Sequence, residues 1–329
     1  WRVRTRLKFH NLPELQDLLG LCWDRVDPRK AGGKRPAIVG ERMRVVETEG
    51  SEELRAYTRE LADRAEQVKK RAVDPSEDNM LKITHDGRVA SVFNGVPSEM
   101  WPTNRVTKLD ACAREVWDLY CHSDEASGVQ LVFCDLFTPK AGSGEDAASL
   151  TSAEQFAQQG VYGVLRDKIV SAGVLPREVA YVHDAASDEE RAELFRRANA
   201  GEVRVLIGST ARMGLGVNVQ RRAYAVHHLT VPWRPDWLDQ ANKRVDRDGN
   251  TMDAVHIICY PTTGSYDVVL WQMIETKANF VAAIGSGTYG GRTADDIGDL
   301  VIDATTAKAI ALGDLRVVAD PRVAEDHRV

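Results

Sequence analysis

Short apolar runs alternate with helical segments between about residue 128 and residue 260, and this alternation constrains the fold of the 329-residue chain most. The run Val129–Cys134 is short and almost wholly apolar, which is typical of a buried parallel strand. Four more strands are expected over 179–183, 203–208, 223–229 and 254–260. Strands and helices that alternate at this spacing predict an α/β fold, with a parallel sheet covered by helices on both faces.

Helices are predicted where apolar residues recur at helical spacing. They are expected over 13–26, 51–72, 111–120 and 153–172, and the capping box Ser187–Glu190 should open another that ends near residue 200. Residues 27–36 should form a loop and residues 74–102 should be irregular. We therefore expect a helical or irregular segment over 1–104, an α/β lobe over 105–285 and a C-terminal helical extension over 286–329.

The loops after the strands are the expected places for chemistry, because ligands of such sheets bind beside the carboxyl ends of the strands. The loops concerned follow Cys134, His183, Gly208 and Leu229. Residues 208–218 read GSTARMGLGVN, where glycines admit a ligand close to the backbone and hydroxyls can hold phosphate oxygens. Taken alone, this segment is equally consistent with a Gly-rich turn between a strand and a helix.

A second constellation follows the fourth strand. A helix is expected over 234–247, with Pro235 in its first turn, and it would carry Gln240, Arg244 and Arg247 on one face. Such a polar stripe is often only a solvated surface, but two guanidinium groups at this spacing can also hold a triphosphate. Trp233, between two prolines, is expected to anchor this helix rather than to stack on a base.

In this order, the two constellations resemble motifs V and VI of superfamily 2 helicases. The pattern Trp-Arg-Pro, then Gln-Ala-x-x-Arg-x-x-Arg-x-Gly, is similar to the Swi/Snf branch. Upstream, 131–135 with Thr138 resembles motif IV, and 183–204 resembles the segment between motifs IV and V. The resemblance covers about 105–285 and implies the second, C-terminal RecA-like lobe of a nucleic-acid-dependent ATPase.

A narrower resemblance is to large proteins of phages and mobile elements that couple an adenine methyltransferase to such a helicase. It rests on the segments 79–88, 227–229 and 267–277. The arginine motif departs from the usual pattern at 241–243 and at Asp246. Asp246 and Asp248 could pair with the neighbouring arginines and compete with phosphate.

The resemblance implies two lobes that close on ATP and Mg²⁺, which a first lobe, missing from this chain, would mainly hold. The implied catalytic residues are Arg244, Arg247 and Gln240. The implied nucleotide contacts are Gly214, Gly216 and Asn218, and the implied contacts to the nucleic-acid backbone are Thr138, Ser209, Thr210 and Arg212. Expected partners are nucleic acid, namely DNA, the first lobe of the same polypeptide and a methyltransferase domain, in the cytoplasm and away from membranes.

The chain contains no Gly-x-x-x-x-Gly-Lys-[Ser/Thr] phosphate loop, since Gly32-Gly33-Lys34 is followed by Arg35. Residues 124–127 imitate a Walker B box but follow a helix, so they are interpreted as a decoy. The chain by itself is therefore expected to hydrolyse no ATP. It begins with Trp-Arg-Val-Arg, which we interpret as a cut inside a longer protein.

The net charge of −6 would argue against a nucleic-acid partner if it were evenly spread. Residues 191–250, however, hold 11 Lys and Arg against 6 Asp and Glu, whereas residues 251–329 hold 6 against 11. Binding depends on the charge that faces the phosphates. The five cysteines contain no Cys-x-x-Cys pair and are expected to be buried thiols, and the adjacent His227 and His228 should face opposite sides of a strand, which disfavours a shared metal.

Two other function classes stay open at this point. A degenerate RecA-like fold could serve as a non-catalytic docking module for nucleic acid or a methyltransferase, and the two aspartates favour this alternative slightly. A nucleotide-sugar enzyme on a similar sheet would not need two arginines on one helix face.

Overall fold

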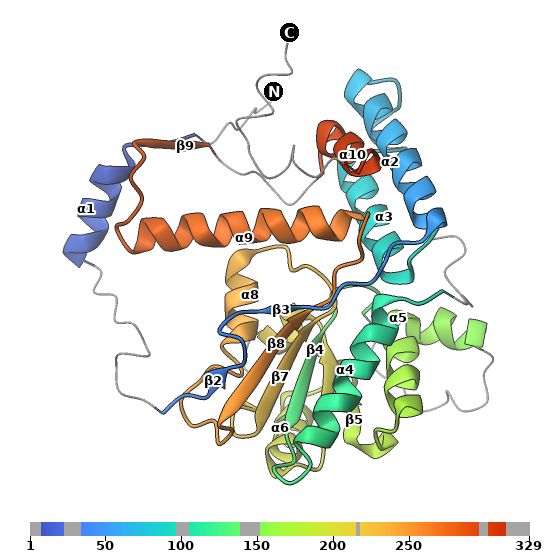
Figure 1. Ribbon diagram of the computed structural model, residues 1–329, viewed down its shortest axis with the longest axis vertical. Coiled ribbons are helices and arrows are strands. Elements are labelled where there is room, and N and C mark those ends of the chain that lie inside the picture. Colours follow the sequence, from blue (N-terminus) through green and yellow to red (C-terminus); the bar gives the residue numbers. More distant parts are fainter. Residues whose placement is uncertain are drawn as a thin grey trace.

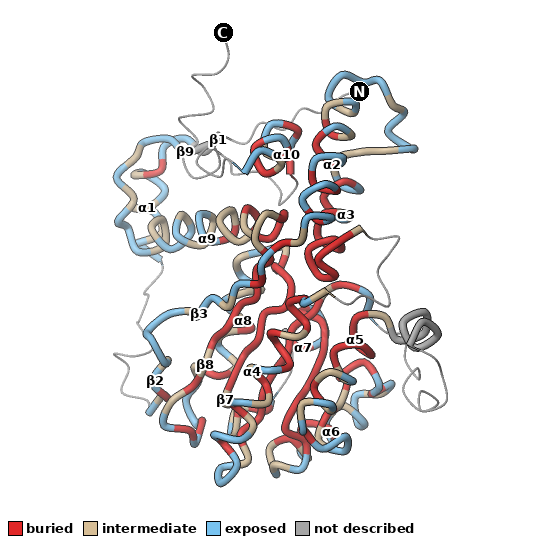
Figure 2. The backbone as a smooth tube through the Cα atoms, turned by 45° about the vertical axis from the view of Figure 1, so that its right-hand side comes forward, coloured by how far each residue is buried: buried red, intermediate tan, exposed pale blue. Residues whose placement is uncertain are grey.

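The molecule is built on one parallel sheet, with a group of helices gathered beyond one end of it (Figure 1). The structure is a computed structural model that describes residues 8–22, 34–96, 105–138, 152–214, 218–295 and 302–313. The tube in Figure 2 shows the central strands of the sheet buried along most of their length.

All five predicted strands are present and parallel. They are β4 (Val129–Phe133), β5 (Val179–Tyr181), β6 (Val205–Gly208), β7 (Ala223–His228) and β8 (Ala254–Cys259). Their order across the sheet is β8-β7-β4-β6-β5. The predicted α/β fold, a parallel sheet with helices on both faces, is confirmed.

Two strands of the sheet come from a segment in which only helices and loops were predicted. β2 (Ala37–Ile38) and β3 (Arg44–Val45) both pair parallel with β8, and an isolated bridge joins Thr48 to Thr262. Strands of two residues leave too short a pattern for the alternation of apolar and polar residues to reveal them. This segment therefore forms the outer edge of the sheet.

Helices cover the two faces as expected. α4 (Lys108–His122) and α5 (Ser152–Ala172) pack on one face, and α5 bends at Gly160, whose φ is 57°. α6 (Asp188–Ala200), α7 (Thr210–Gly214) and α8 (Pro235–Asn242) pack on the other. Ser187 caps α6 as expected, because its side chain accepts a hydrogen bond from the backbone N–H of Glu190, while the Glu190 carboxylate accepts from the N–H of Ala186 in place of that of Ser187.

A third core lies outside the sheet, among α2 (Glu52–Lys70), α3 (Met80–Phe93), α9 (Tyr266–Gly285) and α10 (Ala304–Ala311). In Figure 1, α9 runs across the end of the sheet, with the other three helices gathered to one side. The prediction that residues 74–102 are irregular is wrong for α3. Its Asn79 caps the N-terminus, and burial of its apolar residues outweighs the weak helical pattern of the sequence.

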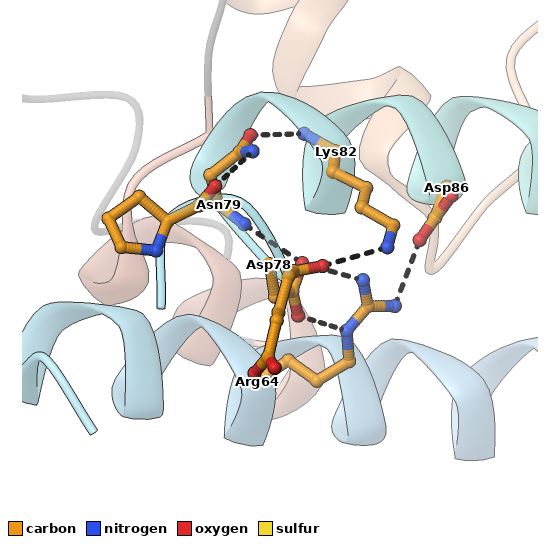
Figure 3. Close-up of polar contacts among 7 residues, drawn as sticks. Arg64, Asp78, Asn79, Lys82 and Asp86 are labelled. Atoms are coloured by element: carbon orange, nitrogen blue, oxygen red, sulfur yellow. Dashed lines mark hydrogen bonds and ion pairs between the residues drawn. The ribbon is translucent and has the colours of Figure 1, made fainter. Parts of the chain in front are cut away.

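An arginine ties α2 to the start of α3 (Figure 3). Arg64 binds Asp78 through two hydrogen bonds, of 2.7 and 2.9 Å, and Asp86 through a third of 2.9 Å. The two carboxylates raise the pKa of Arg64 and hold it charged. Because planar guanidinium groups fix direction as well as distance, this pairing sets the relative position of the two helices.

The remaining described elements lie at the far end of α9. α1 (Leu12–Cys22) agrees with the helix predicted over 13–26 as far as residue 22, and residues 23–26 lie outside the described residues. β1 (Lys8–His10) pairs antiparallel with β9 (Thr293–Asp295). Within the predicted C-terminal extension, α10 is the described helix. None of the helices described here is long and apolar enough to cross a membrane.

Candidate functional site

The carboxyl end of β6 passes directly into the first turn of α7, and Asp135 after β4 caps that turn. The carboxylate accepts hydrogen bonds from the backbone N–H of Thr210, at 2.7 Å, and from its hydroxyl, at 2.8 Å. A carboxylate at a helix N-terminus satisfies donors that the helix itself leaves open. The segments that resemble motifs IV and V are thus joined by this side chain.

Ser209 is held equally firmly. Its backbone N–H donates to Nε2 of His183 at 3.2 Å, and its hydroxyl accepts from the backbone N–H of Arg212 at 3.3 Å. Burial, and secondly the charge of Arg212, lower the pKa of His183. An unprotonated Nε2 is the form that can accept this hydrogen bond, so the lowered pKa and the geometry agree.

The four residues predicted to contact nucleic acid therefore lie in two different environments. Ser209 and Thr210 are 6% and 5% exposed, and their polar groups bind protein atoms. Thr138 and Arg212 are exposed on the same end of the sheet. We retain the prediction of backbone contacts for the exposed pair, and consider that Ser209 and Thr210 shape the loop that presents Arg212.

The loop between β7 and α8 is held at three successive residues. The carbonyl of Leu229 accepts from Nζ of Lys108 at 3.3 Å, and the hydroxyl of Thr230 accepts from the backbone N–H of Asp135 at 2.9 Å. The carbonyl of Val231 accepts from Arg88 at 2.7 Å. The entry to α8 is therefore fixed by α3, by α4 and by the residue that caps α7.

The two cations that hold this loop are buried. Lys108 is 1% exposed and pairs with the equally buried Asp267, whose carboxylate also accepts from the backbone N–H of Thr262 at 3.1 Å. Arg88 lies over the ring of Trp233, 4.1 Å from its centroid, and burial lowers its pKa. In the sequence, Arg88 stands out only within the segment 79–88 that resembles phage proteins. Lys108 does not stand out, because a lysine at the start of a helix usually remains in water.

The helix that was expected to carry Gln240, Arg244 and Arg247 is shorter than predicted. α8 ends at Asn242, and 243–249 follow as turns. The N–H groups of Arg244 and Val245 bond to carbonyls three residues earlier, and that of Arg247 bonds to the carbonyl of Val245, so the four-residue bonding of an α-helix does not continue to Arg247. The expectation of one helix through Arg247 is therefore wrong.

Gln240, Arg244 and Arg247 nevertheless line one pocket, which we call the arginine pocket. It has a volume of about 400 Å³, and Arg35, Lys243 and Asp246 complete its lining. It lies near the amino ends of β7 and β8, since Asn250 binds the carbonyl of Ala223 and β2 follows Arg35 along the edge of β8. The arginine pocket is thus at the end of the sheet opposite to the loops that directly follow the strands.

The charges of the arginine pocket suit an anion. Four of its six lining residues are basic, and Asp246 is the acidic one. Burial, and secondly the charge of Arg247, lower the pKa of Arg244. Two guanidinium groups that disfavour each other are stabilised when a polyanion lies between them.

Asp246 has a partner that the sequence did not suggest. Nη1 of Arg35 donates to the backbone carbonyl of Asp246 at 3.0 Å and lies 3.7 Å from its carboxylate. Asp248 is exposed.

The predicted nucleotide contacts do not gather in the arginine pocket. Gly214 is the last residue of α7, and Gly216 lies outside the described residues. Asn218 is exposed, and its carbonyl accepts from Asn199 at 2.5 Å. It borders a separate depression of about 610 Å³ beside α6.

The histidine pair faces opposite sides of β7, as predicted. His227 lies between the hydroxyl of Tyr260, at 2.6 Å, and the side-chain oxygen of Gln130, at 2.9 Å. His228 contacts Asn242 at 2.7 Å on the other side. Within the described ranges, no group of three metal-ligating side chains comes together.

Residues 124–127, which imitate a Walker B box, have a structural role. Asp124 follows α4 and forms an ion pair with Arg204 at 2.7 Å. Cys112, Cys134 and Cys259 are buried free thiols, while Cys22 and Cys121 are exposed.

The chain is similar to known proteins in part of its sequence and in its fold. Residues 152–249 match the family described as the helicase conserved C-terminal domain. Defense against restriction protein B of Escherichia phage P1 is 33% identical over 70 residues, a match that covers 21% of this chain and only 3% of that protein. The C-terminal part of the Fun30 ATPase domain superposes with a TM-score of 0.49 at 13% identity, over 88% of this chain and 99% of that chain.

The family match contains both constellations that the sequence singled out. It begins with α5 and ends after the arginine pocket, so it includes the capped turn of α7 and all of α8. The segment that supplies Arg35, β2 and β3 lies outside it.

Proposed function

We propose that this chain is the second motor lobe of an ATP-dependent nucleic-acid helicase or translocase. The observation that carries the proposal is that Gln240, Arg244 and Arg247 line one basic pocket, although the helix that was expected to align them ends at Asn242. The match of 152–249 to the helicase C-terminal domain supports it.

The arginines act on the transferred phosphoryl group. ATP with Mg²⁺ supplies the phosphoryl group and its charge neutralisation, and a first lobe holds most of both. When the lobes close, Arg244 and Arg247 meet the charge that spreads over the phosphoryl oxygens in the transition state, and Gln240 orients the group beside them. Because that charge peaks during the reaction, these contacts accelerate turnover more than they strengthen ATP binding.

The nucleic acid lies at the other end of α8. Arg212 and Thr138 contact its backbone, while Asp135 joins the loop that presents Arg212 to the loop that leads into α8. Closing and opening of the lobes then move this end along the strand. The partner is DNA, and a methyltransferase domain accompanies the motor, in keeping with the narrower resemblance to phage proteins and the short phage P1 match.

The roles proposed for the two arginines are tested by measuring ATP turnover in the two-lobed protein, which is this chain joined to its first lobe. Arg244→Ala and Arg247→Ala should each lower kcat by ~10³–10⁵, the value typical of arginine fingers. Arg→Lys should restore little, since an ammonium cannot replace the planar fork. Arg292→Ala is the control, because Arg292 is exposed in an ion pair with Glu14 and lies outside the arginine pocket.

If the chain is instead a non-catalytic docking module, the same substitutions should affect stability and leave turnover unchanged. In a non-catalytic module the two arginines support structure, so their removal would lower the melting temperature and leave turnover unchanged. Normal kcat with reduced thermal stability in both alanine variants would refute the finger assignment.

A further inference from the structure

Arg35 comes from the start of the chain and reaches the pocket of Arg244 and Arg247, more than 200 residues away in sequence. We propose that Arg35 is a positioning residue of the motor, which fixes the loop that carries the two arginines by clamping Asp246. The inference rests on the proposed function and names a residue outside the segment that matches the helicase family.

The backbone beside Arg35 is fixed by the edge of the sheet. The N–H of Ala37 donates to the carbonyl of Asp253 at 2.9 Å, and the N–H of Val39 donates to the carbonyl of Val255 at 2.9 Å. Arg35 therefore stands two residues before a paired strand, and its side chain extends from an anchored point.

Asp246 is the residue that this anchored side chain holds. The guanidinium binds its backbone carbonyl at 3.0 Å and lies 3.7 Å from its carboxylate, with the side chains of Arg35 and Asp246 22% and 19% exposed. A contact to the backbone fixes the chain itself, whereas a contact to the carboxylate alone would fix only a side chain.

Hydrogen bonding becomes irregular where the loop after α8 begins. α8 ends at Asn242, the N–H groups of Arg244 and Val245 bond to carbonyls three residues earlier, and the N–H of Asp246 bonds to the carbonyl of Asn242 at 3.2 Å. Val245 is fully buried, and Asn250 binds its carbonyl, so one side of the loop is anchored in the core. Arg35 anchors Asp246 on the other side, and Arg247 follows directly.

The clamp also gives a role to the carboxylate that the sequence marked as a competitor of phosphate. While Arg35 lies beside Asp246, that negative charge is partly compensated within the pocket wall. Loss of Arg35 releases the loop and exposes ATP to this charge, and a displacement of about 1 Å at a catalytic group is enough to reduce turnover strongly.

The test uses the full two-lobed protein, with kcat, KM for ATP and melting temperature measured on each variant. Arg35→Ala should lower kcat about tenfold and leave KM for ATP within about twofold, because the fingers stabilise the transition state more than bound ATP. Arg35→Lys should recover part of the lost turnover, since an ammonium still reaches the carbonyl of Asp246. Arg42→Ala is the control, because Arg42 is an exposed arginine of the same segment outside the pocket.

A double variant separates the clamp from direct phosphate binding. Asp246→Ala should lower kcat by less than Arg35→Ala, since the carbonyl contact remains, and it should have no further effect when added to Arg35→Ala. If Arg35 bound phosphate itself, KM for ATP would rise in Arg35→Ala and the effects of the two substitutions would add. That pattern, or normal kcat in Arg35→Ala while Arg244→Ala and Arg247→Ala are inactive, overturns the clamp and leaves the proposed function standing. Normal turnover in all three arginine variants overturns both.

Discussion

Trp233 has a buried guanidinium over its ring and packs against the core of the helical group. Trp233→Ala removes both the cation–π contact and apolar burial, so the free energy of unfolding should fall by about 2 kcal/mol, less than for a fully buried ring. Thermal melting measures the change. Trp237→Ala is the control, because the guanidinium of Arg234 lies farther from that ring, at 5.9 Å. Unchanged melting combined with weaker nucleic-acid binding would show instead that Trp233 stacks on a base.

His227 gives the fold a dependence on pH. Burial lowers its pKa from 6.5 to about 3, so it stays neutral in the folded protein and takes up a proton on unfolding below about pH 6.5. The unfolded state therefore binds more protons, and stability falls as the pH decreases from 6.5 towards 3. His228, with a pKa of about 4, acts in the same direction.

We predict that His227→Gln makes this dependence shallower. One fewer proton is taken up on unfolding, so the slope of unfolding free energy against pH should decrease by about 1.4 kcal/mol per pH unit between pH 4 and 6. Urea denaturation at several pH values measures it, with the exposed His122 replaced by Gln as control. An unchanged slope would mean that His227 is protonated in the folded state.

At the scale of elements, the buried pair Lys108–Asp267 joins the start of α4 to the start of α9. Lys108→Met leaves a buried carboxylate without its ammonium and should lower the free energy of unfolding by ~3–5 kcal/mol. Adding Asp267→Leu should recover part of the loss, because the uncompensated charge is then gone.

The control is a second ion pair, one member of which also lies on α4. Lys168 of α5 pairs with Asp110 of α4, but both side chains are more than a quarter exposed, so Lys168→Met should cost less than about 1 kcal/mol. Equal losses for Lys108→Met and Lys168→Met in urea denaturation would contradict the assigned importance of burial.

What the sequence could predict at this scale depended on local pattern. The five predicted strands and the helices around them follow from apolar runs and apolar periodicity, and the cap at Ser187 follows from four residues. α3 was missed because its helical pattern is weak and its burial is tertiary. The end of α8 was missed because the change from four-residue to three-residue hydrogen bonding at Arg244 and Val245 cannot be read from the spacing of residue types.

The site residues also divide into those that a local sequence pattern marks and those that only distant contacts reveal. Gln240, Arg244 and Arg247 were found through a motif, and the structure places them around one pocket. Arg35, Lys108 and Arg88 bind backbone carbonyls far away in sequence, and no local pattern marks such contacts.

For the whole molecule, the uneven charge predicts how nucleic acid binds. Binding by the basic region 191–250 should weaken steeply as salt rises, since phosphate contacts release counterions. Fluorescence anisotropy on a labelled single strand at several salt concentrations measures this. Arg212→Ala should reduce the slope of log affinity against log salt by about 1, whereas Arg292→Ala, outside the region, should leave it unchanged. Affinity that does not depend on salt would exclude the phosphates as the main partner.

The edge strands β2 and β3 determine the order in which the sheet is completed during synthesis. They leave the ribosome more than 200 residues before β8, the strand with which they pair. When β8 emerges, its edge partner is already available, so this side of the sheet is exposed to other chains only briefly. A chain that lacked this early segment would expose the backbone of β8 along its unpaired edge, a surface that favours aggregation.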